Sequence, residues 1–108
     1  MKMRFSKKLI TDEKLQSRKE AVRWKLSHGA GQLSVYCLVL VPQRACLEIM
    51  HNMNFRQPFY EENPPYIVGF ASGKKAAEEL ALKITQEALK ITGKADPAAY
   101  LMMREGLQ

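Results

Sequence analysis

The sequence predicts an α+β fold: one small domain with one mainly antiparallel sheet of three to four strands, packed by two long helices and a short C-terminal helix. Apolar residues recur at helical spacing in two long segments, and short apolar runs bounded by turn residues lie between them. The length of 108 residues supports one domain, residues 1–108, with one modest core. The expected order of elements is (β)αβββαα.

The N-terminal part of the chain is expected to contain a strand and then a helix. Residues 1–10 form an N-terminal arm or an edge strand, because apolar and polar residues alternate weakly there. Thr11 is the expected N-cap of a long helix, and two acidic residues follow it, where the helix dipole favours them. This helix is expected to end at about Ser27, before two nearby glycines.

Three strands are predicted in the middle of the chain. Gln32 to Pro42 indicates a central strand, because both of its alternating faces are largely apolar. After a turn, Ala45 to Met53 forms the returning strand, and a proline-punctuated loop covers residues 54–65. Tyr66 to Phe70 is the third strand, in which Gly69 indicates a bulge or a close approach of another backbone segment.

Two further helices complete the predicted fold. Ser72 is expected to cap a helix over residues 73–92, with Gly93 as the residue that ends it. Asp96, followed by a proline, predicts the start of a shorter helix that runs to about Arg104. Proline at the first helical position sacrifices no hydrogen bond, because the N–H there has no partner within the helix.

The sequence also bears on the cellular compartment. The basic N-terminal residues are followed by a polar stretch rather than an apolar one, so no signal peptide is expected. The longest apolar run, Val35 to Val41, is far shorter than the ~20 residues that a membrane span needs. Pairing Cys37 with Cys46 would require a valine-proline hairpin turn, which both residue types disfavour. We therefore expect free cysteines, a cytoplasmic location and no membrane partner.

The formal net charge of +6 lies in the first quarter of the chain. Residues 1–27 carry all of this excess, and the rest of the chain is balanced. Such an asymmetry favours an anionic partner such as nucleic acid, with Lys14, Arg18 and Lys25 as contacts. A helix that lies on a sheet carries the same residue types at its flanks, so a merely solvated face is the alternative.

Several apolar side chains are candidates for contact with a partner. Both long helices carry an apolar patch away from the main stripe, which packs either inside the domain or on another chain, giving a homodimer or a complex with a small protein partner. The loop over residues 54–65 adds three aromatic residues that either seal the end of the sheet or contact a partner. The candidate partner contacts are Trp24, Leu82, Leu89, Phe55, Phe59 and Tyr60.

A strand-to-helix turn at residues 69–75 is a candidate anion site, because free N–H groups at a helix start attract negative charge. Its glycine spacing and its Lys-Lys pair exclude a nucleotide-binding P-loop. An ordinary capped helix start is the alternative interpretation. The candidate anion contacts in this turn are Ser72, Lys74 and Lys75.

Patterns that carry catalysis are sparse. The chain contains no CxxC, HxxxH or HExxH motif, so neither a metal nor a cofactor is expected. An enzyme would need a small site built from His51, Arg56, Tyr60 or Glu61 near the loop over 54–65, and no spacing requires one. We therefore interpret the chain as a non-catalytic interaction or homo-oligomerising module. A nucleic-acid-associated protein is the alternative, and a small enzyme is the third hypothesis.

Overall fold

The helices and strands follow one another in the predicted order, with short helical segments added. The structure is a computed structural model that describes residues 3–107. In chain order its elements are β1 (Arg4–Thr11), α1 (Glu13–Gln16), α2 (Lys19–Ser27), β2 (Val35–Val41), the 3-10 helix η1 (Pro42–Arg44), β3 (Cys46–His51), the 3-10 helix η2 (Asn52–Arg56), α3 (Phe59–Glu62), β4 (Tyr66–Ser72), α4 (Lys74–Thr92) and α5 (Pro97–Glu105).

The sheet has four strands in the order β1-β4-β2-β3. Strand β2 runs antiparallel to both of its neighbours, whereas β1 pairs with β4 in parallel. The α+β class is confirmed, and the N-terminal segment is an edge strand rather than an arm. The expectation of a mainly antiparallel sheet is wrong, because β1 joins the sheet beside β4, its distant neighbour in the sequence, and makes the sheet mixed.

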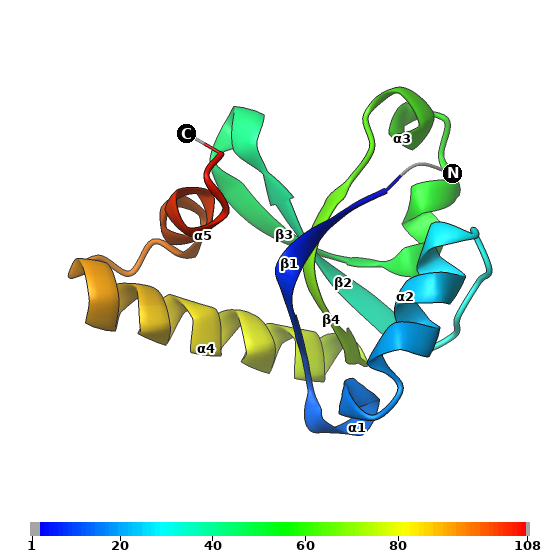
Figure 1. Cartoon of the computed structure of the whole chain (residues 1–108), viewed down its shortest axis with the longest axis horizontal. Coiled ribbons are helices and arrows are strands. Elements are labelled where there is room, and N and C mark those ends of the chain that lie inside the picture. The colour runs from blue at the N-terminus through cyan, green and yellow to red at the C-terminus, as the bar shows by residue number, and fades with distance from the viewer. Residues whose placement is uncertain (1–2, 108) are drawn as a thin grey trace.

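The first helical region consists of two helices, α1 and α2, where the sequence predicts one long helix. Thr11 still belongs to β1, where it pairs with Phe70, so Asp12 takes over as the N-cap of α1. Its Oδ1 accepts a hydrogen bond from the Leu15 N–H at 3.3 Å. A turn at residues 17–18 then redirects the chain, and α2 runs beside β1 (Figure 1).

Strand β2 is buried on both faces, as the sequence predicts for a central strand. In its hairpin with β3, Cys37 lies opposite Met50 and Cys46 lies opposite Val41, so the two cysteines occupy different rungs and both are free. Burial raises the pKa of the Cys37 thiol to about 12, which keeps this cysteine protonated and unreactive.

Gly69 of β4 lies where two backbones come close, as predicted. It pairs with Ile10 of β1, and a Cβ added at this position would lie 2.7 Å from the Ile10 carbonyl oxygen. On the other side of β4, the pairing with β2 shifts register between Leu38 and Val39. The close approach of β1 therefore favours a residue without a side chain at this point.

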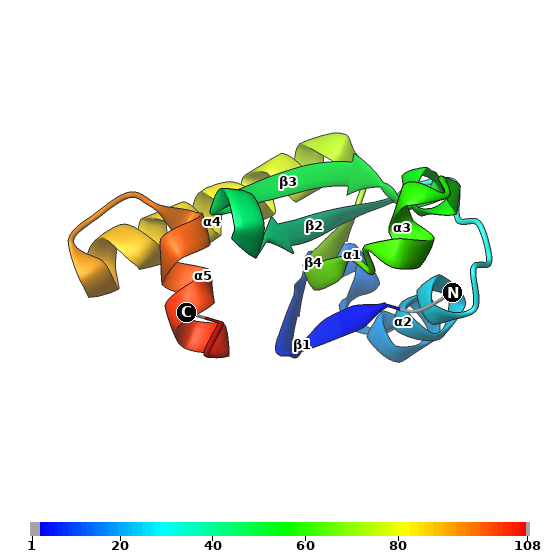
Figure 2. The ribbon, with the colours of Figure 1, turned by 90° about the horizontal axis from the view of Figure 1, so that it is seen from above.

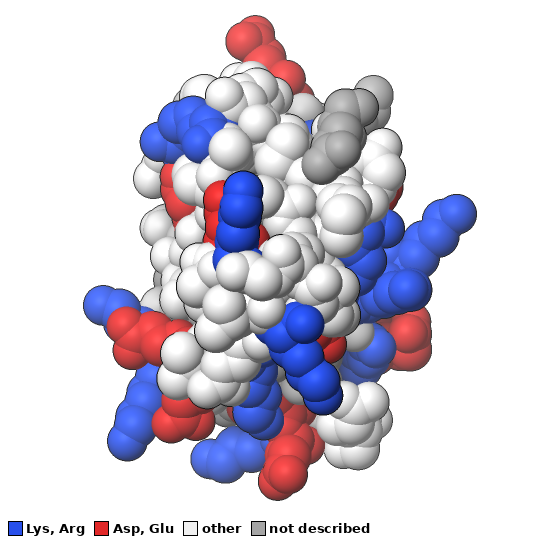
Figure 3. All heavy atoms as spheres, turned by 90° about the vertical axis from the view of Figure 1, so that its left-hand side faces the viewer, with Lys and Arg blue, Asp and Glu red and all other residues white. Residues whose placement is uncertain are grey.

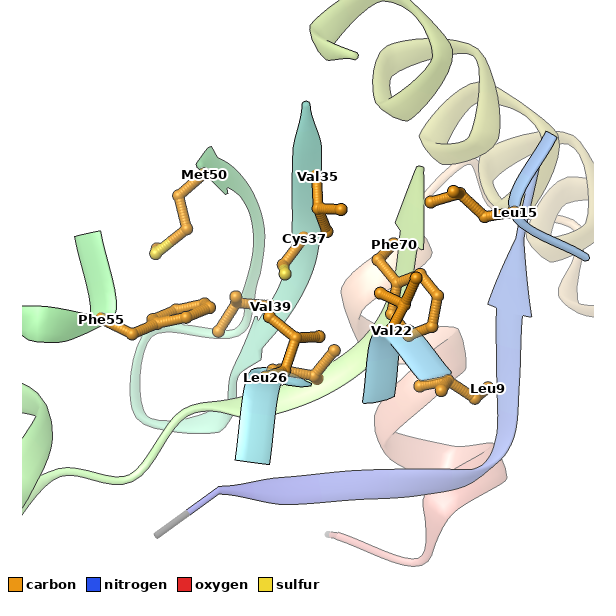
Figure 4. Close-up of a cluster of buried hydrophobic side chains, with 11 residues drawn as sticks. Leu9, Leu15, Val22, Leu26, Val35, Cys37, Val39, Met50, Phe55 and Phe70 are labelled. Atoms are coloured by element: carbon orange, nitrogen blue, oxygen red, sulfur yellow. The ribbon is translucent and has the colours of Figure 1, made fainter. Parts of the chain in front are cut away.

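Helices cover both faces of the sheet, so the domain has three layers (Figures 1 and 2). Helices α1 and α2 pack on one face together with η2, and Figure 4 draws the buried side chains of that core. Helices α4 and α5 pack on the other face. The first core contains Leu9, Leu15, Val22, Leu26, Val35, Cys37, Val39, Met50, Phe55, Ile67 and Phe70. The second contains Leu38, Leu40, Val68, Ala71, Ala77, Leu80, Ile84, Ala88, Ala98, Tyr100 and Leu101.

The predicted loop over residues 54–65 contains helical structure. The 3-10 helix η2 follows β3 directly, and α3 follows after two residues. The buried amide of Asn52 ties this region to the segment before β2. Its Oδ1 accepts from the Gln32 N–H at 3.1 Å, and its Nδ2 donates to the carbonyl oxygens of Gln32 and Val35, the latter at 2.8 Å. The segment after β3 is therefore fixed by hydrogen bonds as well as by apolar packing.

Candidate functional site

A groove of about 680 Å³ lies at the end of the sheet between α3 and the turn that joins β2 to β3. The sheet contributes Val39, Val41 and Met50 to its lining, and α3 contributes Phe59 and Tyr60. None of the described residues of α1 or α2 lines it, so these helices leave this end of the sheet face open. Ligand-binding clefts typically measure about 300–1,000 Å³ and have mainly apolar and aromatic walls. The groove is therefore the candidate binding site.

Aromatic packing holds α3 in place beside the groove. The buried ring of Phe55 meets that of Tyr60 at 5.4 Å, edge to face, and Tyr60 meets Phe59 in the same way at 5.1 Å. The Tyr60 hydroxyl donates to the Met50 sulfur at 3.5 Å, and the Asn63 amide donates to the Phe59 carbonyl oxygen at 3.0 Å. These contacts fix Tyr60 between core and groove, and they leave the Phe59 ring 61% exposed.

Charged side chains of both signs also line the groove. Arg44 and Glu48 form an ion pair with each other. The Arg4 guanidinium lies 5.3 Å from the centre of the Tyr66 ring and donates to the Pro64 carbonyl oxygen at 3.5 Å. Because the two signs occur together, the apolar walls rather than a net charge define the chemistry of this groove.

The six predicted partner contacts are spread over three regions of the molecule. Trp24 on α2 is 59% exposed, and Leu82 and Leu89 on α4 are 56% and 52% exposed. The interpretation that these three side chains pack inside the domain is therefore wrong. Phe59 and Tyr60 line the groove, whereas Phe55 is only 1% exposed. Phe55 points into the core toward Val39 (Figure 4), so it is not a contact for a partner.

The four residues suggested for an enzyme site do not converge. His51 Nε2 contacts the Leu33 carbonyl oxygen at 2.7 Å, and Arg56 donates to the Gly29 carbonyl oxygen at 3.4 Å, both on the segment that precedes β2. Tyr60 turns instead toward Met50, and Glu61 is exposed on α3. The geometry gives these side chains no shared substrate position.

The turn between β4 and α4 is built differently from the prediction. Ser72 still belongs to β4, so the N-cap position of α4 falls to Gly73, with no hydrogen bond from a capping side chain. The Ser72 N–H donates to Asp12 Oδ2 at 3.1 Å. A shallow hollow at this turn is lined by Lys14, Lys75 and Lys83 and, in equal number, by Asp12, Glu13 and Glu79. Internal carboxylates therefore already supply the negative charge that a bound anion would bring.

Replacing Ser72 with alanine is expected to change the free energy of unfolding by no more than about 0.5 kcal/mol. The loss of a capping side chain would cost about 0.5–2 kcal/mol. The matched control is Asp96→Ala, because the Asp96 carboxylate does cap α5, accepting from the Ala99 N–H at 3.1 Å. Urea unfolding of both variants measures the contrast, and equal losses would show that Ser72 caps α4 after all.

The other predicted anion contacts all lie on the surface. Lys14 lies on α1, Arg18 in the turn after it and Lys25 on α2, and all three side chains are exposed. Lys74 and Lys75 are exposed in the first turn of α4. The structure thus separates Lys25 from the α4 turn, whereas Lys14 and Lys75 share the hollow whose charges are balanced.

A polar cluster lies under α5, and the sequence does not predict it. The Glu105 carboxylate accepts hydrogen bonds from Ser6 Oγ at 2.9 Å and from the Tyr66 hydroxyl at 2.7 Å, and it pairs with Arg104 at 3.0 Å. Burial and the hydrogen bond to Glu105 raise the pKa of Tyr66 to about 12. The cluster joins the C-terminal helix to β1 and β4. Its members lie up to 99 residues apart in the chain, so no local sequence motif predicts that they meet.

Two further observations concern ligands and membranes. Within residues 3–107, His, Cys, Asp and Glu nowhere form a group of three or more that could hold a metal ion. In the same part of the chain, every helix is too short or too polar to cross a membrane. Comparison with known protein families, with curated proteins and with solved structures gives no match.

Proposed function

We propose that the protein is a non-catalytic interaction module that binds an extended, apolar segment of a partner protein in the groove beside α3. The observation that carries the proposal is the groove itself, with a volume of about 680 Å³ and the Phe59 ring 61% exposed at its wall. Aromatic residues, phenylalanine among them, are enriched at protein interfaces relative to the rest of the surface.

The free edge of the sheet next to the groove supports an extended ligand. Within residues 3–107, β3 pairs only with β2, and it contains neither lysine nor proline. The opposite edge, β1, carries exposed Lys7 and Lys8 and a register irregularity, which are features that discourage strand pairing. An added strand at β3 would gain main-chain hydrogen bonds, and its alternate side chains would project toward Met50 and Phe59.

A second copy of the chain is the competing occupant, because an open edge strand also pairs with itself. The two cases differ in the oligomeric state of the pure protein. Sedimentation of the wild type is expected to give a monomer, because we propose that the groove binds a different protein and not a second copy of this chain. A concentration-dependent dimer that Phe59→Ala dissociates would identify the occupant as the second copy instead.

The direct test is selection of peptides from a random display library against the wild-type protein. We expect enriched peptides with apolar residues at alternate positions, and Phe59→Ala should weaken their binding by about tenfold or more. Leu82→Ala is the matched control, because Leu82 is similarly exposed (56%) but lies on α4, away from the groove. Anisotropy titrations of labelled peptides measure both variants.

Hydrogen exchange adds a readout of binding mode, because an added strand should protect amides of β3. The proposal fails if no peptide is enriched, or if Phe59→Ala and Leu82→Ala bind the selected peptides equally well.

We also propose a cytoplasmic location for this interaction. The support is chemical: Cys37 and Cys46 are both free, which fits a reducing compartment. Fractionation of cells that express the tagged full chain tests this proposal.

A further inference from the structure

The N-terminal quarter of the described chain carries a concentrated positive charge. Residues 4–25 contain eight Lys and Arg residues and three acidic ones, a net charge of +5. They form β1, α1 and α2, which neighbour one another in Figures 1 and 2. Both ion pairs among residues 3–107 lie elsewhere, at Arg44–Glu48 and Arg104–Glu105. These eight cationic groups are therefore not neutralised by ion pairs within the described chain.

The rest of the described chain is electrically balanced. Residues 26–107 contain eight basic and eight acidic residues. Figure 3 shows the end of the molecule that carries the C-terminal part of α4, where basic and acidic side chains are interspersed. The charge excess of the described chain is thus confined to β1, α1 and α2, and a long anionic partner would be attracted to that side.

An exposed aromatic pair lies within this basic region. Trp24 on α2 is 59% exposed, and its ring stacks on that of His28 with centroids 4.0 Å apart and an interplanar angle of 21°. Arg23 and Lys25 adjoin Trp24 in the sequence and project to either side of it, and the exposed Glu20 lies one helical turn before it. An accessible, supported aromatic face within a basic region is the arrangement on which unpaired bases stack in proteins that bind single-stranded nucleic acid.

A contact between α2 and β1 joins two parts of the basic region. The Arg23 guanidinium lies 4.9 Å from the centre of the Phe5 ring, so α2 reaches across to the edge strand that carries Lys7 and Lys8. The apolar side of α2 is already used, because Val22 and Leu26 are buried in the core. With no free apolar face to insert, the helix fits a nucleic acid better than a lipid surface.

We propose that the basic N-terminal region, which carries Lys7, Lys8, Arg18, Lys19 and Lys25 together with the exposed Trp24, binds single-stranded nucleic acid. The lysine and arginine side chains contact phosphates, and one base stacks on the Trp24 ring. This inference is independent of the groove, since none of these residues lines it. Lys14 is not included, because it lies in the hollow where acidic residues balance the charge.

The experiment uses the full chain and an oligodeoxythymidine single strand. Trp24 is the only tryptophan, so stacking of a base should quench the intrinsic fluorescence directly. Binding is expected to weaken steeply between about 50 and 200 mM salt. The test variant replaces Lys7, Lys19 and Lys25 with alanine, and the charge-matched control replaces Lys83, Lys90 and Lys94. Anisotropy of a labelled strand measures both variants.

The test variant should bind the oligonucleotide about tenfold or more weakly. The slope of log affinity against log salt should become less steep by about 2, because each phosphate contact on a single strand contributes about 0.7 to that slope and the variant removes three contacts. The control variant should resemble the wild type. The proposal is overturned if no binding occurs at low salt, if both variants weaken binding equally, or if anionic phospholipid vesicles bind and the oligonucleotide does not. Binding without quenching of Trp24 would remove the stacking contact and contradict the proposed mode.

Discussion

Replacing Glu105 with alanine is expected to lower the free energy of unfolding by about 3 kcal/mol. The carboxylate accepts hydrogen bonds from Ser6 and Tyr66, and its side chain is only 6% exposed. Without it, two hydroxyl donors lose their acceptor. Arg104, whose side chain is 13% exposed, also keeps a mostly buried charge with no counter-charge beside it. Urea unfolding followed by circular dichroism measures this loss.

The control for this prediction is Glu87→Ala. Glu87 also accepts a hydrogen bond from a tyrosine hydroxyl, that of Tyr100, but it is itself exposed. Water can replace its single contact, so we expect a loss of no more than about 1 kcal/mol. Similar losses in the two variants would show that the cluster under α5 contributes no more than a surface hydrogen bond does.

Because of the same cluster, the free energy of unfolding should depend on pH in the acidic range. Burial alone raises the pKa of Glu105, but hydrogen bonds from Tyr66, Ser6 and Arg104 and the charge of Arg104 outweigh it, so the pKa lies below its ordinary value of 4.5. A carboxyl group with a lowered pKa in the folded state contributes stability above its unfolded pKa, and this contribution is lost as pH falls through the folded value. The stability difference between the wild type and Glu105→Gln should therefore narrow below about pH 4.5.

Boundaries set by adjacent residues were predictable from the sequence. Gly93 ends α4 because its backbone adopts a left-handed conformation, and Asp96 begins α5 because its carboxylate caps the helix. The structure contains both of these predicted boundaries. The two apolar faces of β2 were likewise enough to identify a central strand. Gly69 indicated a bulge or a close approach of another backbone segment, because glycine inside a strand gives up side-chain packing.

Features that depend on distant residues were not predictable. Ser72 has the residue type of a helix cap, yet its place is decided by pairing with Val35 and by the Asp12 carboxylate, 60 residues away. The parallel pairing of β1 with β4 has the same origin, since alternation of residue types gives a strand but not its neighbour. The groove also arises only when α3 and the hairpin turn are brought to one end of the sheet.

Phe55 and Phe59 lie four residues apart but differ in burial, so replacing each with alanine should give very different losses of stability. Phe55 is 1% exposed and packs with Val39 and Met50, whereas Phe59 is 61% exposed beside the groove. Phe55→Ala is expected to lower the free energy of unfolding by about 3–5 kcal/mol, since it leaves a cavity in the core. Phe59→Ala should change it by no more than about 1 kcal/mol, although it removes an aromatic contact that we propose for a bound peptide.

Thermal and urea unfolding of the two variants measure this contrast. Because the residue type and the deleted atoms are identical, a difference in stability reports on the environment alone. Equal and small losses would mean that Phe55 is accessible, which would return it to the set of partner contacts. A large loss for Phe59→Ala would mean that α3 depends on that ring for its fold, and any peptide-binding defect of the variant would then reflect a collapsed groove wall rather than a lost contact.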